Sequence, residues 1–308
     1  MIPIFIETDL HDDVDDVGAL AVAHTLARAG AVDLLGINVN TTSVWGPRLV
    51  SAINRYYGVD TPIGVLQPPS ETLGPQEFVR ATSRLFGTDT TAPVASGVTL
   101  LRHTFAAAGE RGVTMVSLGF FGNLTELLDS GPDAISPLSG AELARRSIAR
   151  TVVMGGCFAG ADQTATSLPE YNFADAPNLT REFLREWPGP IDFIGWEVGQ
   201  DVITGRELLK AHGRESPVFT AYQLHSGYGT GRPSWDLIAV FLAVCPEWPA
   251  FDWSAPGTVS IDHRAVTVWN SDPHGDHRFA VRRHEIGEIA RVIDHYLLQP
   301  SRFTARQC

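Results

Sequence analysis

The chain contains few cysteines and no long hydrophobic run. Among its 308 residues, cysteine occurs only at Cys157, Cys245 and Cys308, and no two of these form a Cys-x-x-Cys pair. This spacing offers neither a disulfide framework nor a zinc site, and it is typical of a reducing compartment. No stretch reaches the roughly 18 consecutive apolar residues that a membrane span requires. We therefore expect no disulfide scaffold and no membrane insertion.

Basic residues and targeting signals are also scarce. The sequence has 23 Lys and Arg residues against 35 Asp and Glu residues, which gives a net charge of −12 and a pI near 5.2. Because nucleic acid polymers are bound through basic surfaces, they are not expected partners. The N-terminus has neither the basic segment nor the cleavable apolar helix of a secretory signal. We expect a cytoplasmic protein.

Short β-rich runs alternate with segments of helical periodicity through the first two thirds of the chain. The predicted strands are residues 2–8, 32–40, 62–66, 113–118, 151–155 and 191–196. Such alternation predicts a mostly parallel sheet with helices on both faces. No Gly-rich motif of the G-x-G-x-x-G or P-loop type follows a strand, which disfavours a nucleotide-binding fold of that kind.

The last third of the chain changes pattern. Residues 198–245 are mostly helical in period and contain a Gly-rich turn at 227–231, whereas 258–262, 265–269 and 277–281 predict a β-meander before a closing helix near 285–298. No linker or repeat divides the sequence. The predicted fold class is therefore α/β, a single domain over residues 1–308. We expect a mostly parallel, Rossmann-like open sheet flanked by helices, with a helical insertion and a small C-terminal β-meander.

Five aspartates crowd into eight residues directly after the first predicted strand: Asp9, Asp12, Asp13, Asp15 and Asp16. Carboxylates this close raise one another's pKa, so such a cluster persists where a cation or many hydrogen-bond donors hold it. One or two of these acids could cap the helix predicted from residue 17 onward, but five exceed that need. The cluster therefore predicts an oxygen-ligand site for Ca²⁺ or Mg²⁺.

Polar or small residues also follow other predicted strands. Asp9, Asn40, Leu118 and Gly155 each lie at or just after the carboxyl end of a strand. In open α/β sheets ligands bind outside these ends, so we expect the four positions to converge on one rim.

Five short motifs, in order along nearly the whole chain, resemble those of the inosine/uridine-preferring nucleoside hydrolase family. They are Thr8-Asp9 with Asp13-Val14-Asp15-Asp16, the turn Gly119-Phe120-Phe121-Gly122-Asn123, Met154-Gly155-Gly156, Glu170-Tyr171-Asn172 and Ser234-Trp235-Asp236. Any one of them is common by chance. Their order after the appropriate strands makes the resemblance specific.

The resemblance implies an N-glycosyl hydrolase that binds Ca²⁺ at the floor of its pocket and cleaves a ribonucleoside or related N-riboside. Asp9 matches the family's general base, which activates a calcium-held water and also contacts the metal. Asp16, Asp236 and the backbone carbonyl of Leu118 match the remaining metal ligands. A base placed beside a cation can both acidify a water and aim it at the ribosyl carbon.

The sugar-binding residues also follow from the resemblance. Asp15, Glu170 and Asn172 match residues that bind ribose hydroxyls, and we expect Asn40 to join them from the rim. The expected partner is a small nucleoside or ribosylated metabolite, and a homo-oligomer, dimer or tetramer, is expected. Among neighbouring positions, Asn123 is expected to be a structural turn residue. Glu197 is either a rim acid or a buried acid held by backbone donors.

Two departures from the family pattern affect these assignments. The family's D-x-x-x-D-D opening is lengthened by two residues here, so Asp13 could take the role given to Asp15. The family's His-Asp pair, whose histidine is the presumed proton donor to the leaving group, is Trp235-Asp236 in this chain. Tryptophan cannot act as an acid.

Three explanations for the missing histidine remain open. His225 is the best-placed alternative acid, although it also fits an ordinary surface histidine. The leaving group could instead need no acid, or Trp235 could stack on an aromatic leaving group. Two other functions stay in view: a nucleoside- or sugar-binding protein without turnover, and a specialised glycosidase for an unusual ribosylated metabolite.

Overall fold

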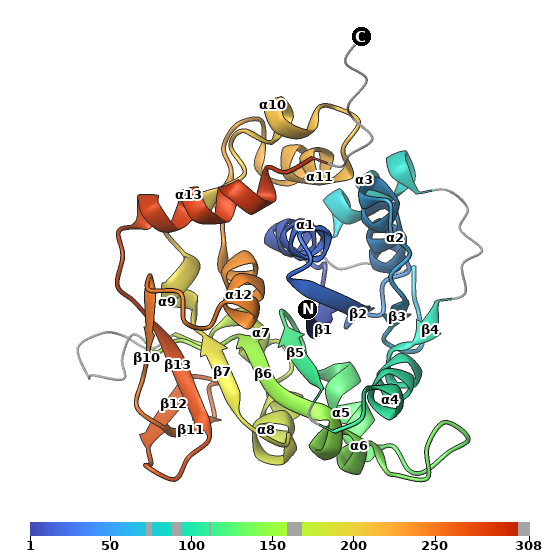
Figure 1. Cartoon of the computed structure of the whole chain (residues 1–308), viewed down its shortest axis with the longest axis vertical. Coiled ribbons are helices and arrows are strands. Elements are labelled where there is room, and N and C mark those ends of the chain that lie inside the picture. The colour runs from blue at the N-terminus through green and yellow to red at the C-terminus, as the bar shows by residue number, and fades with distance from the viewer. Residues whose placement is uncertain (72–75, 88–93, 111, 159–167, 301–308) are drawn as a thin grey trace.

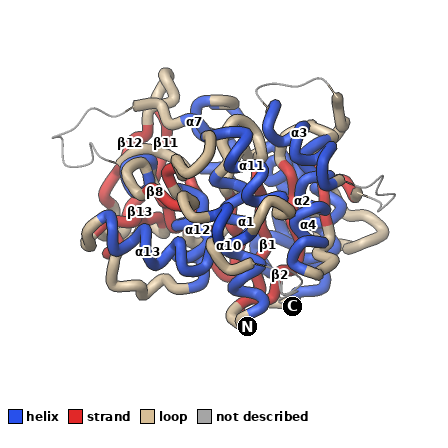
Figure 2. The backbone as a smooth tube through the Cα atoms, turned by 90° about the horizontal axis from the view of Figure 1, so that it is seen from above, coloured by secondary structure: helices blue, strands red, loops and turns tan. Residues whose placement is uncertain are grey.

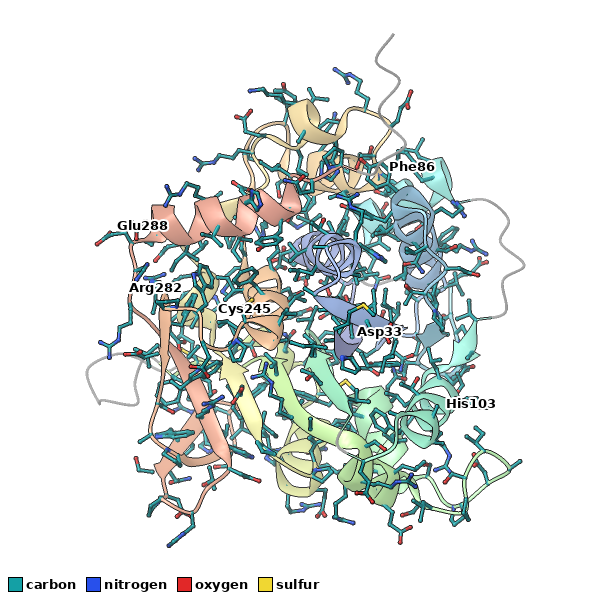
Figure 3. All side chains as sticks on the ribbon, viewed as in Figure 1. Asp33, Phe86, His103, Cys245, Arg282 and Glu288 are labelled. Atoms are coloured by element: carbon teal, nitrogen blue, oxygen red, sulfur yellow. The ribbon has the colours of Figure 1, made fainter. Side chains whose placement is uncertain are left out.

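A computed structural model describes residues 1–71, 76–87, 94–110, 112–158 and 168–300 of the chain. In these ranges no helix combines the length and apolarity needed to cross a membrane. Among the described residues, Cys157 and Cys245 form no disulfide, and Cys308 lies outside these residues. Figure 3 shows Cys245 just after the helix of residues 235–244, among the side chains that fill the space beside the sheet.

One large sheet runs through the described part of the chain (Figure 1). Its strand order is β12-β11-β13-β7-β6-β5-β1-β2-β3-β4, and β10 pairs with β13. The strands are β1 (Ile2–Thr8), β2 (Val32–Val39), β3 (Ile63–Val65), β4 (Ala95–Ser96), β5 (Val113–Ser117), β6 (Ile148–Met154), β7 (Ile191–Ile194), β10 (Phe251–Trp253), β11 (Gly257–Ile261), β12 (Thr267–Ser271) and β13 (His277–Arg282). Pairing from β4 to β13 through β7 is parallel, which confirms the predicted mostly parallel sheet.

Strand β1 lies at the centre of the sheet, between β2 and β5. Ile4, Phe5 and Ile6 are fully buried, because a central parallel strand is covered on both faces and needs a continuous apolar run. The acidic residues of β1 begin only at Glu7, near the carboxyl end of the strand. Residues 9–14, which we call the acidic loop, follow the strand and lead into the helix that begins at Asp15. The sequence thus delivers its carboxylates to the carboxyl end of the central strand.

Helices cover both faces of the sheet (Figure 1). One face carries α1 (Asp15–Arg28), α2 (Trp45–Tyr57), α3 (Glu77–Phe86), α11 (Pro217–Ser226), α12 (Trp235–Val244) and α13 (Ile286–Leu297), and the other carries α4 (Gly97–Ala108), α5 (Gly122–Asp129), α6 (Gly140–Ser147) and α8 (Pro177–Glu186). The short helices are α7 (Tyr171–Ala174), α9 (Trp196–Gly199) and α10 (Leu208–His212). Figure 2 places α7 and the N-terminus at opposite edges of the molecule.

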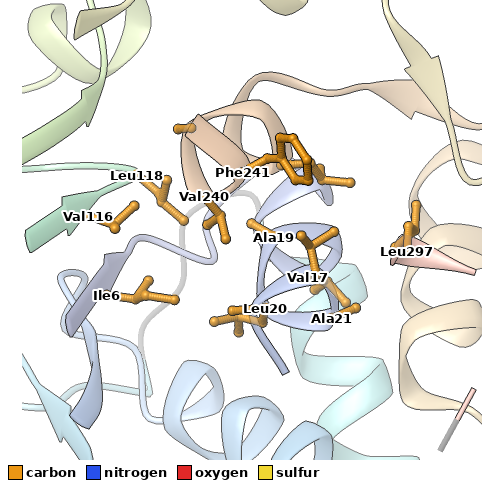
Figure 4. Close-up of a cluster of buried hydrophobic side chains, with 14 of the residues drawn as sticks. Ile6, Val17, Ala19, Leu20, Ala21, Val116, Leu118, Val240, Phe241 and Leu297 are labelled. Carbon is orange, nitrogen blue, oxygen red and sulfur yellow. The ribbon is translucent and has the colours of Figure 1, made fainter. Parts of the chain in front are cut away.

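Helices α1 and α12 pack directly against each other over the sheet. Both are apolar nearly all round, which is the composition of a fully buried helix. Figure 4 shows Val17 and Leu20 of α1 in the same cluster as Val240 of α12 and Ile6 of β1. A Cβ at Gly18 would lie 2.3 Å from the Tyr222 hydroxyl oxygen and 2.9 Å from Leu237 Cδ1, so glycine permits this close approach.

The C-terminal strands differ from the predicted meander. They are antiparallel to one another, but β11 lies between β12 and β13 rather than at one side, and β13 continues the main sheet parallel to β7. Without β13, β7 would be an edge strand with unpaired backbone N–H and C=O groups. Pairing with β13 satisfies these groups. The helical segment also contains a small antiparallel pair that the sequence did not predict, β8 (Ile203–Thr204) and β9 (Arg232–Pro233).

Candidate active site

A pocket of about 270 Å³ gathers the acidic loop and the polar ends of several other elements. It is lined by Asp9, Asp12, Asp13, Asp15, Asp16, Leu118, Met154, Glu170, Tyr171, Asn172, Trp196, Arg232, Trp235 and Asp236. Apart from Asn40 and His225, all the predicted site residues are in this lining. The lining comes from the ends of β1, β5, β6 and β7, from the starts of α1, α7 and α12, from the loop before α1 and from β9.

Three of the carboxylates that line the pocket are buried close to one another. Asp15, Asp16 and Asp236 each offer one oxygen, and these oxygens all lie within 4.8 Å of one another. Asp15 and Asp16 occupy the first turn of α1 and Asp236 the first turn of α12, so the tight packing of the two helices brings the carboxylates together. We call Asp15, Asp16 and Asp236 the acidic triad.

The acidic triad is electrostatically unfavourable without a counter-charge. Burial raises the pKa of Asp16 to about 6, and burial followed by the charge of Asp15 raises the pKa of Asp236 well above its ordinary value. For Asp15 the causes are burial and then the charges of Asp13 and Asp16. Three convergent hard oxygen donors fit a divalent cation, which would favour their charged forms. The residues present therefore suit a metal such as Ca²⁺ or Mg²⁺.

Hydrogen bonds fix the acidic triad to its surroundings. Asp16 Oδ1 accepts hydrogen bonds from the Thr8 hydroxyl and from the Leu10 amide, at 3.3 Å for the latter. Asp15 Oδ2 accepts the backbone N–H of Asp236 at 3.0 Å. These contacts tie the end of β1 to both helix starts. The oxygens are therefore held in place before any ligand binds.

Asp9 lies in the same pocket but outside the acidic triad. Its Oδ1 accepts the backbone N–H of His11 at 3.0 Å. Burial and then the charge of Asp16 raise its pKa well above the ordinary value. Gly119 leaves room for this side chain, because a Cβ there would lie 2.6 Å from Asp9 Cβ. Asp9 is thus a buried acid beside the metal-ligand candidates.

Asp13 and Arg232 form an ion pair at the side of the pocket. Arg232 Nε donates to Asp13 Oδ1 at 2.9 Å and Nη2 donates to Oδ2 at 2.6 Å. Of the two acids between which the sequence could not decide, the structure brings Asp15 into the acidic triad and pairs Asp13 with the arginine. Arg232 was not predicted as a site residue, although it stands three positions before Trp235 in the motif-bearing segment.

Glu170 and Asn172 lie at the start of α7. The Glu170 carboxylate caps this helix, accepting the backbone N–H groups of Asn172 at 2.9 Å and Phe173 at 3.2 Å, and it also accepts that of Gly156 at 2.9 Å. Burial raises its pKa to about 7 against these bonds. Asn172 Nδ2 donates to the Leu118 carbonyl at 3.2 Å. The predicted sugar residues therefore also organise the pocket wall.

Aromatic side chains form another part of the wall. Trp235 Nε1 donates to the Trp196 carbonyl at 2.6 Å, and the Arg232 guanidinium carbon lies 5.9 Å from the centre of the Trp235 ring. Tyr171, between Glu170 and Asn172, places its hydroxyl 3.1 Å from His11 Nδ1. Trp196 and Tyr171 were not predicted as site residues, although each adjoins a segment that was.

Two predicted residues lie beside the pocket rather than in its lining. Asn40 is buried, accepts the Phe120 amide at 3.2 Å and lines a second cavity of about 280 Å³. His225 Nε2 lies 2.8 Å from the backbone carbonyl of Asp12, so this histidine contacts the acidic loop from outside. The other ring nitrogen of His225, Nδ1, lies 2.8 Å from the Ser226 hydroxyl oxygen, so both ring nitrogens have hydrogen-bond partners.

Two neighbouring positions have structural roles. Asn123 Nδ2 donates to the buried Glu7 carboxylate at 2.9 Å, which agrees with its expected structural role. Glu197 accepts the Phe158 amide at 3.1 Å and is not in the pocket lining, which matches the second of its two predicted roles.

The solved structures similar to this chain include several nucleoside hydrolases. A purine-preferring ribonucleoside hydrolase from Gardnerella vaginalis is 17% identical with a TM-score of 0.69, covering 96% of this chain and 98% of that chain. An inosine-uridine preferring nucleoside hydrolase from Bacillus anthracis is 15% identical with a TM-score of 0.68, covering 96% and 99%. A plant nucleoside hydrolase is 16% identical with a TM-score of 0.67, covering 97% and 99%.

Comparison of the sequence with protein-family models and with curated proteins gives no match. The likeness extends over nearly the whole length of both chains in each structural match. At identities of 15–17% it establishes the architecture, and the chain therefore has the fold of the nucleoside hydrolases, as its motifs predicted.

Proposed function

We propose that the chain is a metal-dependent hydrolase that cleaves the N-glycosidic bond of a ribonucleoside or a related N-riboside. The observation that carries this proposal is the acidic triad, buried in one pocket together with Asp9 on a nucleoside hydrolase fold. Hard oxygen donors select Ca²⁺ or Mg²⁺, and we propose Ca²⁺. Asp9, Asp16, Asp236 and the Leu118 carbonyl are its proposed ligands, and Asp15 lies within reach.

The bound cation would supply charge neutralisation and Lewis acidity at the pocket floor. Asp9 then serves as general base, because its carboxylate takes the proton of the attacking water as the oxygen bonds to the ribosyl carbon. Burial and the charge of Asp16 raise the pKa of Asp9 in the metal-free site, and a bound cation would favour its charged form, which is the form that a general base requires. The surrounding carboxylates also stabilise the positive charge that develops on the sugar.

The sugar would be oriented by residues around this centre. Asp15, Glu170 and Asn172 are the proposed partners of its hydroxyls, with Asn40 contributing from the adjoining cavity. Asn172 is fixed by its bond to the Leu118 carbonyl, and Glu170 by three backbone N–H groups. Groups locked in this way lose little entropy when substrate binds, which favours precise orientation.

The leaving group would face the aromatic wall. Trp235 is the proposed stacking partner, since its ring lines the pocket while its indole N–H is already bonded to Trp196. His225 is the proposed alternative contact at the mouth of the pocket. Together with these roles we propose a cytoplasmic homo-oligomer, dimer or tetramer, that acts on a small molecule rather than on a nucleic acid polymer.

A reducing-sugar assay tests the function. Wild-type protein is stripped with a chelator and incubated with a panel of purine and pyrimidine ribonucleosides and other N-ribosides, with and without added Ca²⁺. We expect calcium-dependent sugar release from at least one member. Asp9→Asn should reduce this release by about 10²–10⁴-fold, the range for loss of a general base. The matched control is Asp129→Asn, an exposed acid at the end of α5, which should retain full activity.

Failure of the assay has a defined meaning. Nucleoside binding by calorimetry with no sugar release from any member would favour the alternative, a binding protein without turnover. The observation behind that alternative is that no histidine is among the described residues that line the pocket. Equal rates for wild type and Asp9→Asn would remove Asp9 from the mechanism.

A further inference from the structure

The two departures from the family motif meet in space at Arg232. The lengthened acidic loop contributes Asp13, and the altered helix start contributes Trp235, where the family has histidine. Arg232 contacts both, because Nε and Nη2 are bonded to Asp13 and the guanidinium carbon lies 5.9 Å from the Trp235 ring centre. The substitution of one site residue and the insertion near another are therefore parts of a single arrangement.

Arg232 is a permanent positive charge in an otherwise acidic pocket. Among the described residues of the lining it is the one basic side chain, whereas seven are Asp or Glu. Its side chain is 34% exposed, and the hydrogen bonds that it donates to the Asp13 carboxylate raise its pKa further. Its hydrogen bonds within the described part of the chain use Nε and Nη2, which leaves Nη1 available to a ligand.

Arg232 lies between the acidic side of the pocket and its aromatic wall: its charge acts on Asp13 and Asp15, and its guanidinium carbon is 5.9 Å from the centre of the Trp235 ring. The acidic triad, Asp9 and Asn172 form the side of the pocket proposed to hold the cation and the ribose. Arg232 and Trp235 come from the segment of β9 and the start of α12, at the aromatic wall. In the proposed orientation the hydroxyls of the riboside face the triad and the group on its anomeric carbon faces Arg232 and Trp235.

We propose that Arg232 stabilises the negative charge of the departing group, in place of a proton donor. This inference rests on the proposed function. Arginine is not deprotonated in proteins, so it acts by charge and hydrogen bonding and cannot transfer a proton. The substrate class is then an N-riboside whose leaving group departs as a delocalised anion, such as a heterocycle with carbonyl or acidic substituents next to the bonded nitrogen.

The step balances without a further reactant. The bond between the anomeric carbon and nitrogen breaks, and both electrons go to the nitrogen of the leaving group. The water oxygen bonds to the anomeric carbon and its proton passes to Asp9. Arg232 binds the anionic leaving group, and Trp235 stacks on the ring of that group. The anion is protonated by solvent after its release.

A leaving-group series tests this role. Rates of sugar release are measured for 5-substituted uridines whose free bases span a range of acidity, using wild type, Arg232→Gln and Arg232→Lys. Gln removes the charge but can still donate to Asp13, and Lys keeps the charge. For Arg232→Gln we expect kcat/KM to fall by about 10²–10³-fold with the least acidic leaving group, the usual loss for one charge-stabilising donor. The loss should shrink steadily as the leaving group becomes more acidic, and Arg232→Lys should restore most of the wild-type dependence.

Controls separate this role from a structural one. Arg146→Met changes an exposed arginine on α6 and should leave the whole series unchanged. Calcium affinity and melting temperature are measured on each variant. A loss that is equal for every leaving group would overturn the proposal and assign Arg232 to holding Asp13. The proposed function would survive that result, whereas no sugar release by calcium-loaded wild type from any riboside would refute both.

Discussion

Trp235 is the residue at which this chain departs most clearly from the nucleoside hydrolase motifs that it resembles, and its contacts indicate two separable contributions. Its ring lines the pocket, and its indole N–H holds the Trp196 carbonyl at 2.6 Å. Trp235→Ala should lower kcat/KM by an amount equivalent to about 1–3 kcal/mol, the range for loss of base–aromatic stacking. Trp235→Phe keeps the aromatic face without the N–H and should retain most of the activity.

Melting temperatures and kcat/KM on the two Trp235 variants decide the matter. If Trp235 only packs, the alanine variant should lose about 3–5 kcal/mol of folding free energy, as large aromatic truncations do. A large loss of stability with unaltered kinetics in the folded fraction would contradict a leaving-group role.

The buried side chain of His212 should make the free energy of unfolding sensitive to acid. Burial is the main cause that lowers its pKa from 6.5 to about 4, and Nε2 lies 2.9 Å from the Leu297 carbonyl. Between these pH values the unfolded chain binds a proton that the folded chain excludes, so acidification from pH 6.5 through 4 favours unfolding. The loss is at most about 3 kcal/mol.

Urea unfolding of wild type and His212→Leu at pH 7, 6, 5 and 4 measures this component. The stability advantage of wild type over the variant should narrow steadily as the pH falls. A difference that is constant with pH would show that His212 has an ordinary pKa in the folded protein.

Some residues of the pocket can be predicted from the short sequence motif around them, and others only from contacts with distant parts of the chain. Asp9, Asp16 and Asp236 could be predicted because each stands in a short motif at a strand end or helix start. Arg232 could not, since its partner Asp13 is 219 positions away in the chain and nothing in the local sequence links them. The choice of Asp15 for the acidic triad likewise depends on how α1 packs on α12.

At the scale of elements, Gly18 controls the distance between the two helices that carry the acidic triad. A Cβ there would meet the Tyr222 hydroxyl at 2.3 Å and Leu237 Cδ1 at 2.9 Å. Gly18→Val should therefore cost about 1–3 kcal/mol of folding free energy through overpacking. It should also weaken calcium binding, because Asp236 would move away from Asp15 and Asp16.

Calcium titration calorimetry and thermal unfolding test this variant against a matched control. Gly287→Val places the same substitution in the first turn of α13, where a Cβ would meet no atom within 4 Å. That control should bind calcium as wild type does. Wild-type calcium affinity in Gly18→Val would show that the close approach of the helices does not position the carboxylates.

The elements themselves were largely predictable, and the exceptions have a common cause. The central strands are continuous apolar runs such as Ile4–Ile6, and their sequence pattern alone indicates burial in a parallel sheet. The predicted meander was wrong in its order because β13 pairs with β7, a choice set by the edge of the finished sheet. Strands of two residues, such as β8 and β9, are too short to leave a periodic signal.

At the scale of the whole molecule, the fold brings the proposed cation ligands together from distant segments, so metal binding should stabilise the entire structure. A ligand that binds only the folded state adds RT ln(1 + [L]/Kd), about 2.7 kcal/mol at 100 times Kd. Calcium should therefore raise the melting temperature of chelated wild type. It should raise that of Asp236→Asn much less, since one ligand of the acidic triad is replaced by a neutral amide. An equal rise in both proteins would place the stabilising ion elsewhere.

The central claim is that Asp16 and Asp236 of the acidic triad, together with Asp9, hold the cation on which glycosidic bond cleavage depends. The most direct measurement is the rate of ribose release as a function of free calcium, for wild type and Asp236→Asn, after both are stripped with a chelator. The account predicts negligible release by wild type without calcium and a saturable rise as calcium is added, with the Asp236→Asn curve displaced to higher calcium. Undiminished ribose release in excess chelator, or superimposable curves for the two proteins, would contradict it.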